Sequence, residues 1–179
     1  SEDGGLFMPA VIPHADLEKV RELSECSFSE LSRYLTRLFF GDELPEARTD
    51  AIAAEACRFP VPLKQVGKDK YTLELFHGPT FAFKDIGAGF MGHALRALNR
   101  TAEETIILTA TSGDTGSAVA NGFYGIEGVK VVILYPDGQV SDLQESQMAT
   151  LGGNIFPLKV KGTFDDCQRI VKDIFSDAD

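Results

Sequence analysis

A single lysine stands among aromatic and small residues in the stretch 75–85, Leu-Phe-His-Gly-Pro-Thr-Phe-Ala-Phe-Lys-Asp. Apolar residues recur at helical spacing from Ile86 onward, so Lys84 is expected at the first turn of a helix that Asp85 caps and that ends at Asn99. Apolar neighbours and the positive end of a helix dipole both favour a neutral amine over an ammonium group. A neutral amine can form a Schiff base. From these local features alone, a Schiff-base lysine and an ordinary solvated lysine at a helix start are equally supported.

A second candidate is the turn at residues 111–116, Thr-Ser-Gly-Asp-Thr-Gly. The β-branched run at 105–110 has the composition of a buried parallel strand, and the small residues after the turn indicate a helix. Where a strand is followed by a glycine-containing turn and the N-terminus of a helix, backbone N–H groups are free to bind an anion. The hydroxyls of Thr111, Ser112 and Thr115 add hydrogen-bond donors. The turn is therefore predicted to bind a phosphate or carboxylate, with an ordinary capped turn as the alternative.

Residues 87–92, Gly-Ala-Gly-Phe-Met-Gly, match the dinucleotide-binding pattern G-x-G-x-x-G. That pattern requires a strand immediately before it and an acidic residue about 20 positions later. Here Lys84 and Asp85 precede it, and the apolar helical stripe continues through the glycines. We therefore expect these small residues to let two helices pack closely, and a dinucleotide-binding α/β domain is the competing hypothesis.

The composition of the 179 residues, 44% apolar and 25% charged, is that of a folded globular protein. A net charge of −10 without a basic stripe predicts no nucleic-acid partner and favours a small-molecule substrate. Cys26, Cys57 and Cys167 form no C-x-x-C pair, so neither a disulfide framework nor a metal site is expected, and a reducing cytoplasm is the predicted location. No apolar run approaches the roughly 20 residues of a membrane span, so no membrane partner is expected.

Helical spacing dominates residues 1–62, which are predicted to form a helical N-terminal region. Its helices are expected from Asp16, from residue 28 to near Gly41, and over 50–59. Residues 63–179 are predicted to form an α/β core in which strands and helices alternate. Strands are expected at 61–64, 71–76, 105–110, 129–135 and 155–160, with helices over 85–99, after Ser141 and over 163–175. The predicted fold class is α/β, a helical N-terminal region followed by part of a parallel twisted sheet with flanking helices.

The lysine stretch and the Ser-Gly-Asp-Thr-Gly turn together resemble the threonine synthase family of fold type II pyridoxal-phosphate enzymes. The motif residues are 74–85 and 109–116, and further segments similar to the family lie at 3–9, 130–136 and 151–154. The resemblance thus runs through almost the whole chain. With an opening at Ser1 in place of Met and an uncapped end at Asp179, the sequence is expected to be truncated at both ends.

The resemblance implies a role for each motif. Lys84 would hold pyridoxal 5'-phosphate as a Schiff base and then move protons at the substrate's Cα and Cβ. The implied reaction converts O-phospho-L-homoserine and water to L-threonine and phosphate. Phe83 would be a wall of the cofactor pocket, and Asp114 would contact the cofactor or order its loop. The residues implied to bind the substrate carboxylate are Thr111, Ser112, Gly113, Asp114 and Thr115.

Asp114 also distinguishes this family from related enzymes, because relatives that synthesise cysteine or dehydrate amino acids usually have Asn at this position. A sibling dehydratase or sulfhydrylase is therefore the weaker alternative, beside a non-catalytic relative that binds cofactor or a partner without turnover. In this family the loop for the cofactor phosphate comes later in the chain, and no second loop of that kind occurs between Gly116 and Asp179. The piece alone is expected to be inactive.

Overall fold

The structure is a computed structural model that describes residues 5–6, 8–98 and 104–177. It divides into two compact units, residues 1–54 and 55–179, whereas the sequence pattern placed the division after residue 62. Ala56 and Cys57 are buried, and the Ala56 carbonyl oxygen lies 3.6 Å from the position of a Cβ on Gly89. These contacts with later residues place the segment after residue 54 in the second unit.

The elements in the described part of the N-terminal unit are helices, and side chains cap the starts of the first two α-helices. The Asp16 carboxylate caps α1 (Leu17–Glu22), which runs into the 3₁₀ turn η1 (Leu23–Glu25). Helix α2 (Phe28–Phe40) begins with a capping box between Ser27 and Glu30, and its bounds agree with the helix predicted from residue 28 to near Gly41. The residues that carry this signal are adjacent in the chain, which is why the sequence predicts both ends.

Helix α3 (Glu46–Ala56) begins and ends earlier than the predicted range 50–59. Pro45 starts it, since the Pro45 carbonyl accepts a hydrogen bond from the Thr49 N–H at 3.2 Å. The predicted end at residue 59 was placed by Pro60, which disfavours helical geometry only in Phe59 before it, and it was wrong because α3 already ends at Ala56.

A bidentate ion pair joins α2 to α3. The Arg37 guanidinium contacts Asp50 through Nε at 2.7 Å and Nη2 at 2.5 Å, and Nη1 lies 2.6 Å from Glu46 Oε1. The hydrogen bond from Arg37 holds the pKa of the Asp50 carboxyl below its usual range.

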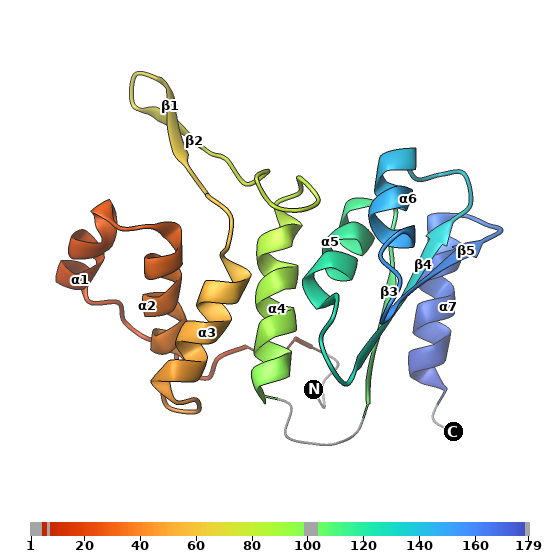
Figure 1. The fold of residues 1–179 in the computed structure, drawn as a ribbon, viewed down its shortest axis with the longest axis horizontal. Helices are drawn as coiled ribbons and strands as arrows, with labels where there is room; N and C mark the ends of the chain where they lie inside the picture. The colour runs from red at the N-terminus through yellow and green to blue at the C-terminus, as the bar shows by residue number, and fades with distance from the viewer. Residues whose placement is uncertain (1–4, 7, 99–103, 178–179) are drawn as a thin grey trace. The chain divides into compact units, whose positions relative to one another are not determined.

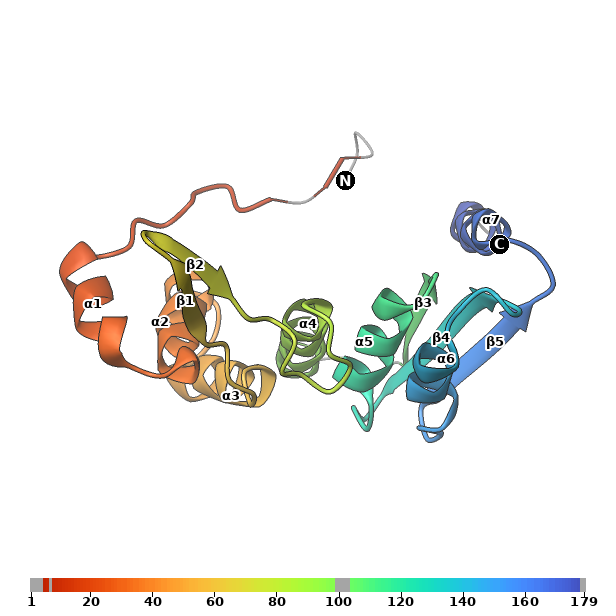
Figure 2. The same ribbon diagram turned by 90° about the horizontal axis from the view of Figure 1, so that it is seen from above.

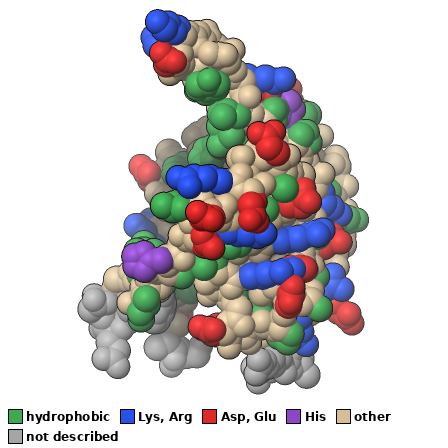
Figure 3. All heavy atoms as spheres, turned by 90° about the vertical axis from the view of Figure 1, so that its left-hand side faces the viewer, with side chains coloured by type: hydrophobic (Ala, Val, Ile, Leu, Met, Phe, Trp, Pro, Cys, Tyr) green, Lys and Arg blue, Asp and Glu red, His purple; other side chains and the backbone are tan. Residues whose placement is uncertain are grey.

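On the face shown in Figure 3, Lys and Arg side chains are interspersed with Asp and Glu.

The first strands of the second unit form an antiparallel hairpin of exposed residues, β1 (Leu63–Gly67) and β2 (Lys70–Leu73). The predicted strands 61–64 and 71–76 had the right type and the wrong bounds. Leu63 pairs with Leu73 at the open end of the hairpin, and beyond it the Glu74 N–H donates to the Pro62 carbonyl oxygen at 3.0 Å, whereas Pro62 has no N–H to donate in return.

A three-stranded parallel sheet follows, in the order β3 (Thr105–Ala110), β4 (Val129–Pro136) and β5 (Ile155–Val160). Figures 1 and 2 show α5 (Asp114–Phe123) and α6 (Asp142–Ala149) on one face of the sheet and α7 (Phe164–Ser176) on the other. Parallel strands joined through helices confirm the predicted α/β class, and the twist is visible in Figure 2.

Helix α4 (Lys84–Leu98) packs against α5, so the second unit extends beyond the sheet. The two helices meet at glycines, because a Cβ on Gly92 would lie 2.4 Å from the Gly122 carbonyl oxygen. The G-x-G-x-x-G match at 87–92 is thus inside a helix, and the expectation of close packing is confirmed at Gly92. The predicted end of this helix at Asn99 lies outside the described residues. No helix in the described part of the chain is both long and apolar enough to cross a membrane.

Candidate active site

Lys84 is the first residue of α4, and its amine meets the second motif of the chain. Lys84 Nζ donates a hydrogen bond to Thr115 Oγ1 at 2.8 Å, across 31 positions of sequence. The Phe83 ring lies beside the same amine, with its centroid 5.7 Å from Nζ. The structure therefore brings together the lysine stretch and the polar turn that the sequence singled out separately.

The turn before Lys84 is held by a buried carboxylate. Asp85 is 4% exposed, and its oxygens accept hydrogen bonds from Thr80 N–H at 2.9 Å and Thr80 Oγ1 at 2.5 Å. The prediction that Asp85 caps the helix was wrong, because Lys84 already belongs to α4 and the Asp85 side chain reaches back to Thr80 instead. Within this turn Phe81 has a φ of 62°, an unusual conformation for a residue with a side chain. The Thr80–Asp85 bonds thus close a strained turn directly before Lys84.

A single threonine hydroxyl organises the turn at the start of α5. Thr111 is 1% exposed, and its Oγ1 accepts from Gly113 N–H at 3.0 Å and Gly116 N–H at 2.8 Å. Gly113 has a φ of 148°, which favours glycine. The first intrahelical bond of α5 runs from Ser117 N–H to Gly113 O, so the amides of Asp114 and Thr115 precede it in the free first turn.

Three further predicted site residues, Ser112 and Asp114 in this turn and Phe83 before α4, are exposed. Ser112 is exposed, and the exposed Asp114 accepts a hydrogen bond at Oδ1 from Gln144 Nε2 at 2.7 Å. Phe83 is 62% exposed, so its ring covers one side of the Lys84 amine while its other side faces outward.

An open pocket of about 280 Å³ adjoins the lysine. Apart from Lys84 and the Thr115 hydroxyl, its lining is aromatic, aliphatic or glycine: Phe83, Gly87, Ala88, Met91, Ala118 and Val119. A Cβ on Gly87 would meet nothing within 4 Å. One lysine amine at the edge of an apolar recess is suited to a flat ring with a polar rim.

Comparison with known proteins follows the same two parts of the chain. A family model described as "Pyridoxal-phosphate dependent enzyme" matches residues 53–179, and one described as "Threonine synthase N terminus" matches residues 1–57. The chain belongs to the pyridoxal-phosphate dependent enzyme family. Lys84 and the 111–115 turn both lie within the residues that this family model matches.

Similar members of the family are named threonine synthase. The protein from Haemophilus influenzae is 50% identical over 177 residues, 99% of this chain and 41% of that protein. The structure of PLP-bound threonine synthase from Brucella melitensis is similar, with a TM-score of 0.90 at 37% identity over 98% of this chain and 39% of that one. The threonine synthase structure from Escherichia coli gives 0.84 at 45% identity, covering 99% and 41%. The chain thus spans about two fifths of the length of the curated relatives that it matches.

The residues beside Lys84 fit the cofactor of this pyridoxal-phosphate dependent family. Lys84 Nζ lies at the pocket edge, and the hydroxyl of Thr115 holds it there. The small side chains and Gly87 leave room for a ring against α4. The loop that binds the cofactor phosphate was predicted to lie later in the family's sequence, and that stays a prediction.

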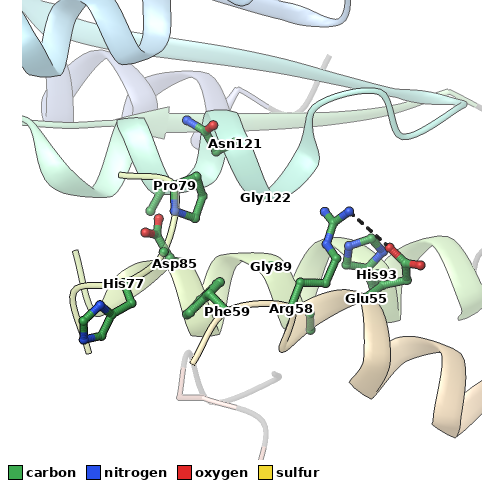
Figure 4. A pocket seen from close by; sticks show the side chains of 13 residues that line it. Glu55, Arg58, Phe59, His77, Pro79, Asp85, Gly89, His93, Asn121 and Gly122 are labelled. Atoms are coloured by element: carbon green, nitrogen blue, oxygen red, sulfur yellow. Dashed lines mark ion pairs between the residues drawn. The ribbon is translucent and has the colours of Figure 1, made fainter. Parts of the chain in front are cut away.

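A second pocket of about 330 Å³ lies along a neighbouring stripe of α4. Figure 4 shows His77 and Asp85 at one end and the Glu55–Arg58 ion pair with His93 at the other. Burial lowers the pKa of His93 from its ordinary value. The charged groups of this pocket, which include Glu55, Arg58 and Asp85, have both signs. The recess beside Lys84 is the better candidate active site, because the two sequence motifs meet there.

Sequence reasoning missed the α6 residues that reach the two motifs. Gln144 contacts Asp114, and Gln147 Nε2 donates to the Thr80 carbonyl oxygen at 3.4 Å. One signal was readable, since Ser141-x-x-Gln144 is a capping-box pattern and places Gln144 in the first turn of α6. Nothing in the sequence showed which loop that turn would face. Among the described residues, no group of three or more His, Cys, Asp or Glu could hold a metal ion.

Proposed function

We propose that the full-length protein, a chain of the relatives' length that contains this sequence, is a threonine synthase. It converts O-phospho-L-homoserine and water to L-threonine and phosphate. The observation that carries the proposal is the hydrogen bond between Lys84 Nζ and Thr115 Oγ1, which joins both motifs at one apolar pocket. The names of the similar proteins in Haemophilus influenzae and Escherichia coli support the same reaction.

In this proposal Lys84 is the catalytic residue and the attachment point of pyridoxal 5'-phosphate. When bound, the cofactor supplies an electron sink for negative charge that develops on the substrate. The Lys84 amine, held at Thr115, moves protons at the substrate's Cα and Cβ. Phe83 and the aliphatic lining of α4 exclude water from one side of the site.

The turn before α5 is proposed to bind the substrate carboxylate. Ser112, Gly113, Asp114 and Thr115 surround the free N–H groups at the helix start, where an anion is favoured. Thr111 supports this site indirectly, because its buried hydroxyl is bonded to the N–H groups of the turn. Asp114 is directed to Gln144, which favours its role in ordering the loop.

A cytoplasmic location is proposed with the enzyme. Cys26 and Cys167 form no disulfide, and Cys26 is exposed, which suits a reducing compartment.

Release of phosphate from O-phospho-L-homoserine by the full-length protein with pyridoxal phosphate tests the proposal. Wild-type protein should form phosphate and L-threonine in equal amounts, and Lys84→Ala should abolish both. Lys172→Ala, an exposed lysine of α7, is the matched control and should retain activity. Formation of ammonia, or of a product that requires sulfide, would instead identify a sibling lyase. Saturable binding of NADH would favour the dinucleotide hypothesis.

A further inference from the structure

Gln144 uses both ends of its side-chain amide. Its Oε1 accepts hydrogen bonds from the Ser141 N–H at 3.2 Å and the Ser141 hydroxyl at 3.0 Å, which completes the capping box of α6. Its Nε2 donates to Asp114 Oδ1 at 2.7 Å. Inverting the amide would set an oxygen against the Asp114 carboxylate and an NH₂ group against the Ser141 N–H, so its orientation is fixed from both sides.

The choice of glutamine at this position is informative. A capping box can have either Glu or Gln at its third helical residue. In the described part of the chain, the capping boxes of α2 and α7 have acidic residues there, Glu30 and Asp166, and the box that faces Asp114 has Gln144. A glutamate at 144 would still cap α6 but would place two carboxylates in contact, which is repulsive.

Gln144 also sets the path of the turn backbone. A Cβ on Gly113 would lie 2.4 Å from Gln144 Nε2 and 2.6 Å from Oε1, so the buried Gly113 passes directly over the amide. On the other side, the Ser117 hydroxyl of α5 donates to the Gln144 carbonyl oxygen at 3.2 Å. Gln144 of α6 therefore contacts the backbone of the turn at Gly113, the Asp114 side chain, and Ser117 in the helix that follows.

We propose that Gln144 is a positioning residue, which holds the 112–115 turn, and through it the substrate carboxylate, in place relative to Lys84. The inference rests on the proposed function, since it takes that turn as the carboxylate site. Gln147, one helical turn further along α6, contacts the segment before Lys84 through the Thr80 carbonyl, so α6 braces both motifs from one element. Removing the donor at 144 while keeping the cap should loosen the carboxylate site and leave cofactor attachment intact.

The test compares Gln144→Glu with wild type in the full-length protein with bound cofactor. The variant keeps the capping-box acceptor, so the protein should still fold and the visible absorbance of the bound cofactor should match wild type. Its KM for O-phospho-L-homoserine should rise about tenfold or more, with a smaller change in kcat, because a charged hydrogen bond is replaced by like-charge repulsion. Glu30→Gln makes the opposite exchange in the α2 capping box and should leave KM unchanged.

The double variant Asp114→Asn with Gln144→Glu reverses the donor and the acceptor and should restore the contact. Gln144→Glu should therefore raise KM much less in the Asp114→Asn background than in the presence of the native Asp114. An unchanged KM for Gln144→Glu, or equal increases in both backgrounds, would overturn the role of Gln144. If wild-type protein releases no phosphate, the proposed function fails and this inference fails with it. If wild-type protein is active and Gln144→Glu leaves its KM unchanged, this inference alone is refuted.

Discussion

Two glycines of α4 are predicted to respond in opposite directions to the same substitution. Gly92 faces α5, where a Cβ would lie 2.4 Å from the Gly122 carbonyl oxygen and 3.0 Å from Ile126 Cδ1. The first of these atoms is backbone and cannot rotate away. Gly87 lies one and a half turns earlier on the same helix, and a Cβ there meets nothing within 4 Å.

The magnitudes follow from two opposing effects. Alanine is favoured over glycine in a helix interior by about 1 kcal/mol. Overpacking against a neighbour costs about 1–3 kcal/mol, and a contact with rigid backbone belongs at the upper end of that range. Gly92→Ala should therefore destabilise the α4–α5 pair by about 2 kcal/mol, the difference of the two effects. Gly87→Ala should stabilise α4 by about 0.5–1 kcal/mol.

Amide hydrogen exchange of α4 and α5 in the cofactor-free, full-length protein measures both effects, since it reports the stability of local elements. Cofactor is left out because Gly87 lines the pocket beside Lys84. Protection of both helices should fall in Gly92→Ala and rise in Gly87→Ala. Equal protection in the two variants would refute the close packing at Gly92, and with it the interpretation of residues 87–92 as a packing motif.

Three further predictions concern the site and its supports. Thr115→Val should lower kcat/KM about tenfold while Thr115→Ser retains activity, because only serine keeps the acceptor for Lys84. Asp85→Ala should lower the free energy of unfolding by about 2–3 kcal/mol in chemical denaturation, since both Thr80 donors lose a buried acceptor, and Asp85→Asn should cost less. The lowered pKa of His93 means that the unfolded chain binds its proton more readily, so stability should fall as pH drops below the ordinary value of 6.5. His93→Gln should weaken this pH dependence of the thermal midpoint, and an unchanged pH profile would contradict the burial of His93.

Local signals in the sequence predicted most of the elements. The capping residues Ser27 and Ser141 act within one turn of their own position, and the β-branched run before Thr111 needs only its own composition to indicate a buried strand. The position of Lys84 at a helix start was likewise confirmed. Such features follow from the sequence because each depends on residues close together in the chain.

Contacts across the fold were beyond the reach of pattern and spacing. Gln144 meets Asp114 across 30 positions, and the pairing exists only because parallel strands bring the starts of α5 and α6 to the same end of the sheet. Asp85 was misjudged for a related reason, since an acidic residue beside a helix start is read as a cap until the buried Thr80 is seen. The residues around Lys84 were predictable by type, and their mutual orientation required the packed structure.

The central claim, that Lys84 carries the cofactor, is tested most directly by chemical trapping. The full-length protein would be incubated with pyridoxal phosphate, reduced with borohydride, digested and mapped by mass spectrometry. The account predicts one stable label on the peptide that contains Lys84, its loss in Lys84→Ala and its retention in Lys172→Ala. A label on another lysine, or no label at all in wild-type protein, would contradict the assignment of Lys84 and leave only the fold in common with the family.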